Sequence, residues 1–83
     1  MRSLELETVV VRRLTASRKT LAVAESCSGG LIAHRITNVP GASEIFLGGV
    51  VAYSNAAKMT VLGVREENLM EKGAVSEATA RAM

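Results

Sequence analysis

Two short apolar segments, with a helical segment between them, most constrain how this chain can fold. Residues 20–24 (TLAVA) and 45–53 (IFLGGVVAY) are apolar and partly β-branched, which predicts two strands. Residues 29–37 have helical spacing, and residues 38–41 (NVPG) end that helix because proline and glycine interrupt it. A strand, a helix and a strand in this order predict a β-α-β crossover in an α/β layer architecture.

Further helices are predicted on both sides of this crossover. Residues 3–18 form an amphipathic pattern in which Ser3 is a suitable N-cap. Residues 55–62 and 66–71 are predicted to be helices; the first ends at Gly63 and the second at Lys72-Gly73. Ser76 has the position of an N-cap for a last helix, EATARAM, which carries a start signal and no stop signal.

The two predicted strands are too few to cover helices on both faces of a sheet. We therefore expect a layered α/β/α sheet domain that is truncated in these 83 residues. A partner or a missing half would complete it, and we expect a homo-oligomer. The apolar side chains expected to associate with the second copy or the missing half are those of Leu21, Val23, Val50 and Val51.

Composition narrows the classes of function. Phe46 and Tyr53 are the only aromatic residues, so a platform that stacks nucleic-acid bases is not expected. No segment is apolar and long enough to cross a membrane, and one cysteine cannot form an internal disulfide. We expect a cytoplasmic protein without a nucleic-acid or membrane partner.

The charged residues of the first helix allow two interpretations. Acidic residues come first and basic residues follow, an order that the helix dipole favours. The basic residues could alternatively form a patch that binds an anion; they are Arg12, Arg13, Arg18 and Lys19.

The first candidate site is the segment ESCSGG, residues 25–30, directly after the first strand. Ligands of α/β folds bind beyond the carboxyl ends of the strands, and free N–H groups in the first turn of a helix can bind an anion or an oxyanion. Ser28 is the expected N-cap, although a capped turn without chemistry has the same pattern. Cys27 is expected to be a small packed residue rather than the nucleophile. Glu25 either accepts hydrogen bonds that orient the site or faces solvent.

The second candidate site is AYSNAAK, residues 52–58. If Asn55 is the N-cap, Lys58 lies in the first helical turn, where the helix dipole disfavours an ammonium group. The lysine is then either simply solvated or partly buried and able to take a proton. A general base must be neutral, and an ordinary lysine is almost fully protonated at pH 7, so this role needs unusual surroundings. His34 is expected to be a surface histidine, and no metal cluster or phosphate-binding loop is present.

Five sequence blocks at these two sites and beyond them occur together in one known family. The blocks are A-E-S-C-[ST]-G-G, V-P-G-[AS]-S, Y-S-N-x-A-K, L-G-V and G-A-V-S. Over residues 20–83, the chain resembles the CinA C-terminal domain family, the nicotinamide-nucleotide amidases, which are also named for competence and damage induction. The residues before this part correspond to a variable leading helix.

The resemblance implies an enzyme that hydrolyses the carboxamide of nicotinamide mononucleotide to nicotinate mononucleotide and ammonia. Ser26 would be the nucleophile and Lys58 its general base, a Ser–Lys form of the activated hydroxyl. Tyr53 would line the site and help to place substrate or proton. No metal and no cofactor are implied.

The resemblance also implies a set of substrate-binding or oxyanion-binding residues. They are Glu25, Cys27, Ser28, Gly29, Gly30 and Asn55, with the oxyanion held by backbone N–H groups. The family carries a second, glycine-rich half with basic residues that bind substrate, and residues 1–83 correspond to the N-terminal half alone. We therefore expect a catalytic half-site that is inactive by itself, or a non-catalytic half-domain that self-associates.

Overall fold

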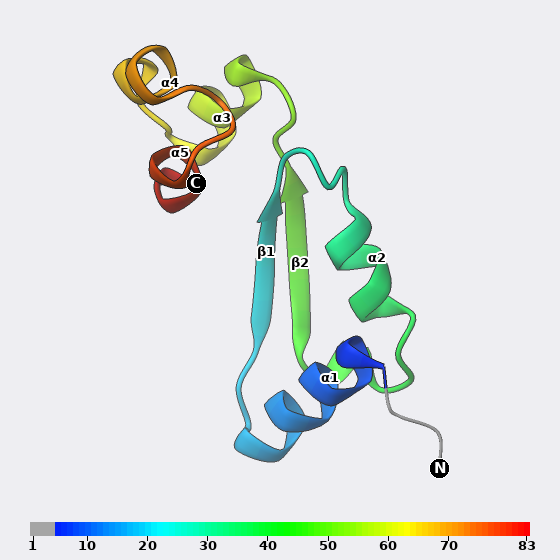
Figure 1. Ribbon diagram of the computed structural model, residues 1–83. Helices are drawn as coiled ribbons and strands as arrows, with labels where there is room; N and C mark the ends of the chain where they lie inside the picture. The colour runs from blue at the N-terminus through cyan, green and yellow to red at the C-terminus, as the bar shows by residue number, and fades with distance from the viewer. Residues whose placement is uncertain (1–4) are drawn as a thin grey trace. The chain divides into compact units, whose positions relative to one another are not determined.

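A computed structural model describes residues 5–83 of the chain as a mixed helix and strand fold (Figure 1). Its elements in order are α1 (Leu6–Ser17), β1 (Leu21–Glu25), α2 (Leu31–Thr37), the 3-10 helix η1 (Ala42–Glu44), β2 (Phe46–Val51), α3 (Asn55–Leu62), α4 (Glu66–Lys72) and α5 (Glu77–Ala82). This order confirms the α/β class and the helix between two strands.

The strands β1 and β2 pair directly in a small two-stranded parallel sheet. Near its start, the Leu21 N–H donates to the Ile45 carbonyl at 2.7 Å, and near its end the Ala52 N–H donates to the Glu25 carbonyl at 2.8 Å. The chain divides into two compact units, and both strands pass from one to the other. The first unit contains Gly30–Val50 and the chain up to Val23, and the second contains Ala24–Gly29 and Val51–Met83.

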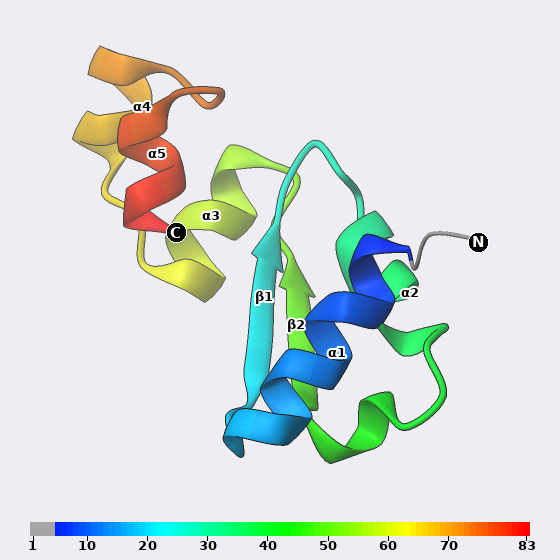
Figure 2. The ribbon, with the colours of Figure 1, turned by 60° about the horizontal axis from the view of Figure 1, so that its bottom comes forward.

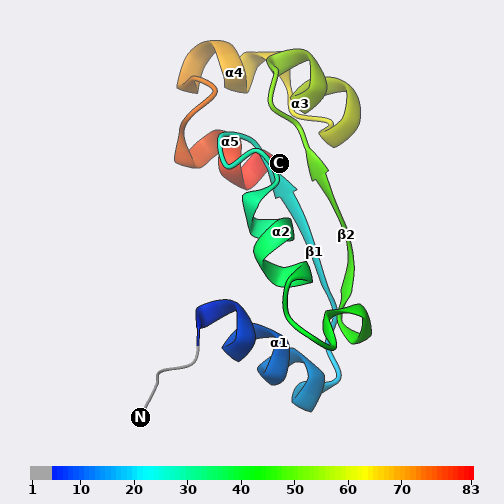
Figure 3. The same cartoon turned by 90° about the vertical axis from the view of Figure 1, so that its right-hand side faces the viewer.

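The core of the first unit joins α1, α2, η1 and the start of β2. Figure 3 shows α1 and α2 on one side of the strands. Burying apolar side chains between these elements stabilises the fold by about 25 cal/mol for each Å² of apolar surface removed from water. The buried members of the core are Val11, Ile36, Val39, Ala42 and Ile45, and the partly buried residues packed against them are Val10, Leu14, Leu21 and Phe46.

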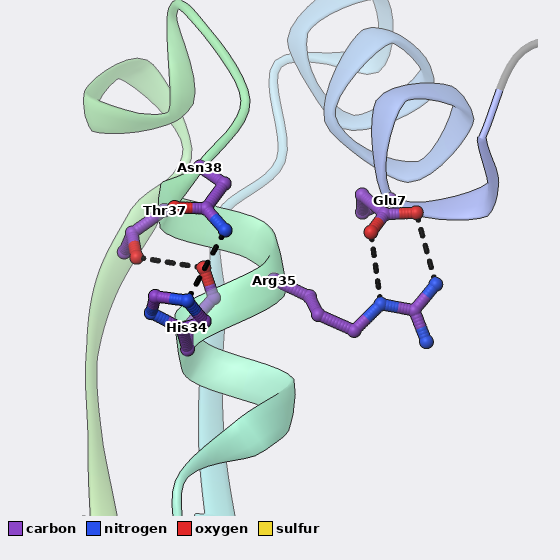
Figure 4. A network of polar contacts seen from close by, with 5 residues as sticks. All are labelled: Glu7, His34, Arg35, Thr37 and Asn38. Atoms are coloured by element: carbon purple, nitrogen blue, oxygen red, sulfur yellow. Dashed lines mark hydrogen bonds and ion pairs between the residues drawn. The ribbon is translucent and has the colours of Figure 1, made fainter.

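An ion pair links α1 to α2 at the edge of this core (Figure 4). The Arg35 guanidinium donates to both carboxylate oxygens of Glu7, at 2.8 Å from Nε and 3.0 Å from the second nitrogen. The hydrogen bonds from Arg35, with help from the Glu7 backbone N–H, lower the pKa of Glu7 to about 2. The same hydrogen bonds raise the pKa of Arg35. The pair therefore stays ionised and fastens two helices that are 28 residues apart in sequence.

The second unit is built from short helices closed by caps. Figure 2 shows α4 and α5 side by side. The Ser76 hydroxyl accepts from the Thr79 N–H at 3.1 Å, which confirms Ser76 as the N-cap of α5. The fully buried Thr79 hydroxyl donates to the Gly73 carbonyl at 2.6 Å, so the turn between α4 and α5 is closed from inside.

Three expected helix starts are corrected. Ser3 lies outside the described residues, and the N-cap position of α1 is occupied by Glu5. The N-cap of α2 is Gly30 rather than Ser28, because Gly29 and Gly30 both have positive φ (61° and 95°) and extend the turn before the helix begins. The N-cap of α3 is Ser54 rather than Asn55, and its hydroxyl accepts from the Ala57 N–H at 3.0 Å.

At Gly49, the second strand β2 closely approaches β1 and α2. A Cβ atom at Gly49 would lie 2.8 Å from Val23 Cγ2, 3.3 Å from the Val23 carbonyl oxygen and 3.8 Å from Ala33 Cβ. Only glycine leaves room for the neighbouring strand and for α2 at this point.

The apolar surface of the strands differs from the expected one. Leu21 packs against the core of the first unit, so its side chain is not free to bind a second copy. Val23 and Val50 are half-buried, whereas Leu47 is 73% exposed and Val51 is exposed as expected. Among residues 5–83, no helix is long and apolar enough to cross a membrane.

Candidate functional site

Lys58 is the central residue of the candidate site, because its position in the fold is uncommon for a lysine. It lies in the first turn of α3, as expected, and its side chain is only 1% exposed. Lysine is almost never fully buried unless it is paired. The Nζ atom donates to the Tyr53 carbonyl at 2.8 Å. The alternative of a simply solvated lysine is therefore wrong.

Ser26 lies in the same compact unit as Lys58. It directly follows β1 and is half-buried, in a turn closed by a hydrogen bond of 2.9 Å from the Gly29 N–H to the Ser26 carbonyl. Among the described residues, no hydrogen bond joins the Ser26 hydroxyl to the Lys58 amine. Such catalytic contacts often form only when substrate is bound.

The turn after Ser26 limits which amides could bind an oxyanion. The Gly29 N–H is already engaged by the Ser26 carbonyl, so it is not available in this conformation. The exposed Cys27 and Ser28 precede it in the second unit, and their N–H groups remain candidates. Gly30 belongs to the first unit, where it caps α2, and its role in binding stays a prediction.

Tyr53 and Asn55 flank the start of α3, and both are exposed. The Tyr53 side chain is 69% exposed, so its ring is free to contact a ligand while its carbonyl holds Lys58. Asn55 is the first residue of α3 and not its cap. The sequence prediction chose Asn55 and missed Ser54 as the N-cap of α3. Serine is as good an N-cap as asparagine, so the adjacent Ser54 was an equally suitable candidate.

The remaining site expectations have mixed outcomes. Cys27 is exposed, so the expectation of a small packed residue is wrong. Glu25 is buried, which excludes the alternative that it faces solvent, and its carbonyl accepts from the Ala52 N–H. His34 is exposed as expected, and its Nε2 atom lies 3.3 Å from Asn38 Nδ2 (Figure 4).

The basic residues of α1 do not follow the expected dipole order in full. Glu7 lies in the first turn, but the last turn contains no basic residue, and Arg18 is the left-handed C-cap with φ 55°. Arg18 and Lys19 line a cavity of about 250 Å³ together with Glu44. The helix carbonyls and this carboxylate both disfavour an anion there.

Three comparisons relate this α/β arrangement to known proteins. The chain matches the family model of the CinA C-terminal domain over residues 3–83. It is 58% identical over 79 residues to a CinA-like protein of Thermotoga maritima, and 56% identical over 78 residues to one of Desulfovibrio desulfuricans. These matches cover 95% and 94% of this chain but only 19% and 18% of the relatives.

Solved structures agree with the sequence matches. The competence damage-inducible protein A of Klebsiella pneumoniae is 39% identical with a TM-score of 0.90, over 93% of this chain and 48% of that one. A competence/damage inducible protein of Agrobacterium tumefaciens is 38% identical with a TM-score of 0.81, over 100% and 53%. The chain thus spans about a fifth of the curated relatives and about half of these solved chains.

The fold and the family match define the class as a CinA-type α/β domain. The chain belongs to the CinA C-terminal domain family.

Proposed function

We propose that the domain whose N-terminal half is formed by residues 1–83 hydrolyses the carboxamide of nicotinamide mononucleotide to nicotinate mononucleotide and ammonia. Ser26 is the nucleophile, Lys58 the general base, and Tyr53 a residue that contacts the substrate. The observation that carries the proposal is the burial of Lys58, whose amine is held on a backbone carbonyl in the unit that contains Ser26.

In the first half of the proposed reaction, the Ser26 hydroxyl oxygen attacks the carboxamide carbon and its proton passes to the Lys58 amine, which acts as the base. The carbonyl oxygen becomes an oxyanion, for which the N–H groups of Cys27 and Ser28 are the proposed donors. When the tetrahedral intermediate collapses, Lys58 returns the proton to the departing nitrogen. Ammonia leaves, and the acyl group remains on Ser26.

In the second half, a water molecule attacks the acyl carbon and transfers a proton to Lys58. The C–O bond to Ser26 then breaks, the proton returns to the serine oxygen, and nicotinate mononucleotide is released. One water is consumed and one ammonia produced. We assign the remaining residues of the resemblance to substrate binding; they are Glu25, Gly29, Gly30 and Asn55. We place the reaction in the cytoplasm.

An ammonia-release assay tests the proposal. Two proteins are each incubated with nicotinamide mononucleotide. One is the 83-residue chain, and the other is a longer chain that spans the full length of the solved family structures. We expect turnover from the longer chain and none from the 83 residues alone, because the basic substrate-binding residues implied by the resemblance lie outside them. If the longer chain releases no ammonia, the proposed reaction is wrong.

A second function is supported by the exposed apolar side chains of both units. Leu47 in the first unit is 73% exposed, and Met70 and Val75 in the second are 79% and 83% exposed. A non-catalytic half-domain that associates with its own copies would cover such residues. Self-association without turnover in a longer chain would favour this function.

A further inference from the structure

Both ends of the short helix α3 are hydrogen-bonded to Lys58, the residue whose side-chain amine is buried. Its eight residues, Asn55–Leu62, make barely two turns, so an isolated helix of this length would not persist in water. What keeps it formed therefore decides where Lys58 lies.

At the start of α3, Ser54 supplies two contacts. Its hydroxyl accepts from the Ala57 N–H at 3.0 Å, and its carbonyl accepts from the Lys58 N–H at 3.0 Å. Ser54 thus satisfies an N–H group that would otherwise have no partner, and it sets the first turn in which Lys58 lies.

At the end of α3, the block L-G-V turns the chain back toward Lys58. Gly63 is left-handed (φ 71°, ψ 20°), and its N–H donates to the Met59 carbonyl at 3.1 Å. The next N–H, that of the buried Val64, donates to the Lys58 carbonyl at 3.0 Å. The Gly63 hydrogen bond is that of the αL C-cap motif, which uses a left-handed residue at Gly63, and the Val64 hydrogen bond adds a second contact to Lys58.

The Lys58 side chain makes the third contact. Its amine donates to the carbonyl of Tyr53, the residue directly before Ser54. The backbone N–H, the backbone carbonyl and the side-chain amine of Lys58 are therefore all held, and the three contacts come from both ends of one short helix.

We propose that Gly63 and Ser54 are positioning residues for the Lys58 amine, an inference that rests on the proposed function of Lys58 as base. The closure at Gly63 and the cap at Ser54 hold the amine in its buried place on the Tyr53 carbonyl. Neither residue touches the reacting atoms. The L-G-V block serves the site by keeping its base in one position.

Competitive acylation of lysines, read by mass spectrometry, tests this on the 83-residue chain. The chain has three lysines, and Lys19 and Lys72 are exposed and serve as internal references for Lys58. In the unchanged chain we expect Lys58 to react far more slowly than both. Gly63→Ala places a side chain in the left-handed region, and we expect the relative rate at Lys58 to rise about fivefold to thirtyfold.

Gly41→Ala is the matched control. Gly41 is also left-handed (φ 87°), a Cβ atom added there would likewise have no neighbouring atom within 4 Å, and it belongs to the other unit. The strain is similar, but the relative rate at Lys58 should not change. Gly63→Asn should restore slow labelling, because asparagine tolerates the left-handed region.

Ser54 provides a second route to the same result if Gly63→Ala fails to fold. Ser54→Ala should speed labelling of Lys58, and Ser54→Asp should restore slow labelling because aspartate is an equally good cap. Equal labelling of Lys58 in the Gly63 and Gly41 variants, or no rescue by asparagine and aspartate, would overturn the proposal. Nicotinamide mononucleotide is absent from this experiment, so its failure is distinct from failure of the amidase reaction.

Discussion

Lys58 and Ser26 lie in one compact unit, and they act as a base and a nucleophile only if the function of each requires the other. In the proposed reaction, Lys58 has no function without a hydroxyl to deprotonate, and Ser26 is a weak nucleophile without a base. The two residues should therefore behave as one unit when they are mutated.

In a chain that spans the full length of the solved family structures, we predict that Ser26→Ala and Lys58→Ala each lower the rate of amide hydrolysis on the order of a thousandfold or more. The double variant should lose little activity beyond that. Ammonia release at saturating nicotinamide mononucleotide gives the rates. Cys27→Ala is the control, and it should keep most of the activity. Activity that survives Ser26→Ala but not Cys27→Ala would assign the nucleophile to the thiol.

Gly49 gives a prediction about stability at the same scale. A methyl group there would lie 2.8 Å from Val23 Cγ2, so Gly49→Ala should destabilise the fold by about 1–3 kcal/mol through overpacking. Val23→Ala removes that clash and should recover part of the loss in the double variant, which urea unfolding would measure. Additive losses in the double variant would show that the contact is not the cause.

At the scale of the elements, the ion pair between α1 and α2 predicts how stability depends on pH. The pKa of Glu7 is lowered from 4.5 to about 2 in the folded chain, so folding favours the ionised carboxylate. Its contribution is fully present above pH 4.5 and is lost as the pH falls from about 4.5 to 2. Urea unfolding across this range should show a shallower loss of stability in Glu7→Gln than in the unchanged chain.

The partner variant serves as the control for this prediction. Arg35→Gln removes the donor of both hydrogen bonds and should reduce the acid dependence as Glu7→Gln does. The double variant should behave like either single one. An unchanged slope in Arg35→Gln would mean that another partner holds the Glu7 carboxylate.

The elements also show what the sequence could predict. The bounds of α3 and α5 follow from local capping chemistry, since Gly63 ends the one and Ser76 starts the other. The start of α2 differs from the prediction because two successive glycines allow a longer turn than a serine cap would. The Glu7–Arg35 pair joins residues far apart in sequence, and no local pattern indicates such a contact. The sequence leaves the burial of Lys58 as one of two alternatives, because it depends on what packs around α3.

At the scale of the whole molecule, a small core and exposed apolar side chains predict self-association. The sheet has two strands, and Leu47 on the second is 73% exposed. We expect the 83-residue chain to sediment as a species whose mass increases with concentration, and Leu47→Lys to shift it toward the monomer. Val61→Lys, at a similarly exposed position in α3, is a control that tests whether any added charge has this effect. A monomer at all concentrations would contradict the prediction.

The division of the chain into two units has a consequence for the order in which the molecule is made. The second unit combines Ala24–Gly29 with Val51–Met83, and the segment between them belongs to the first unit. During synthesis, Ser26 leaves the ribosome well before Lys58, and the first unit can close while the second still lacks most of its residues. The candidate site is therefore assembled last. A ribosome that stops shortly after Val50 would release a chain with its serine and without its lysine.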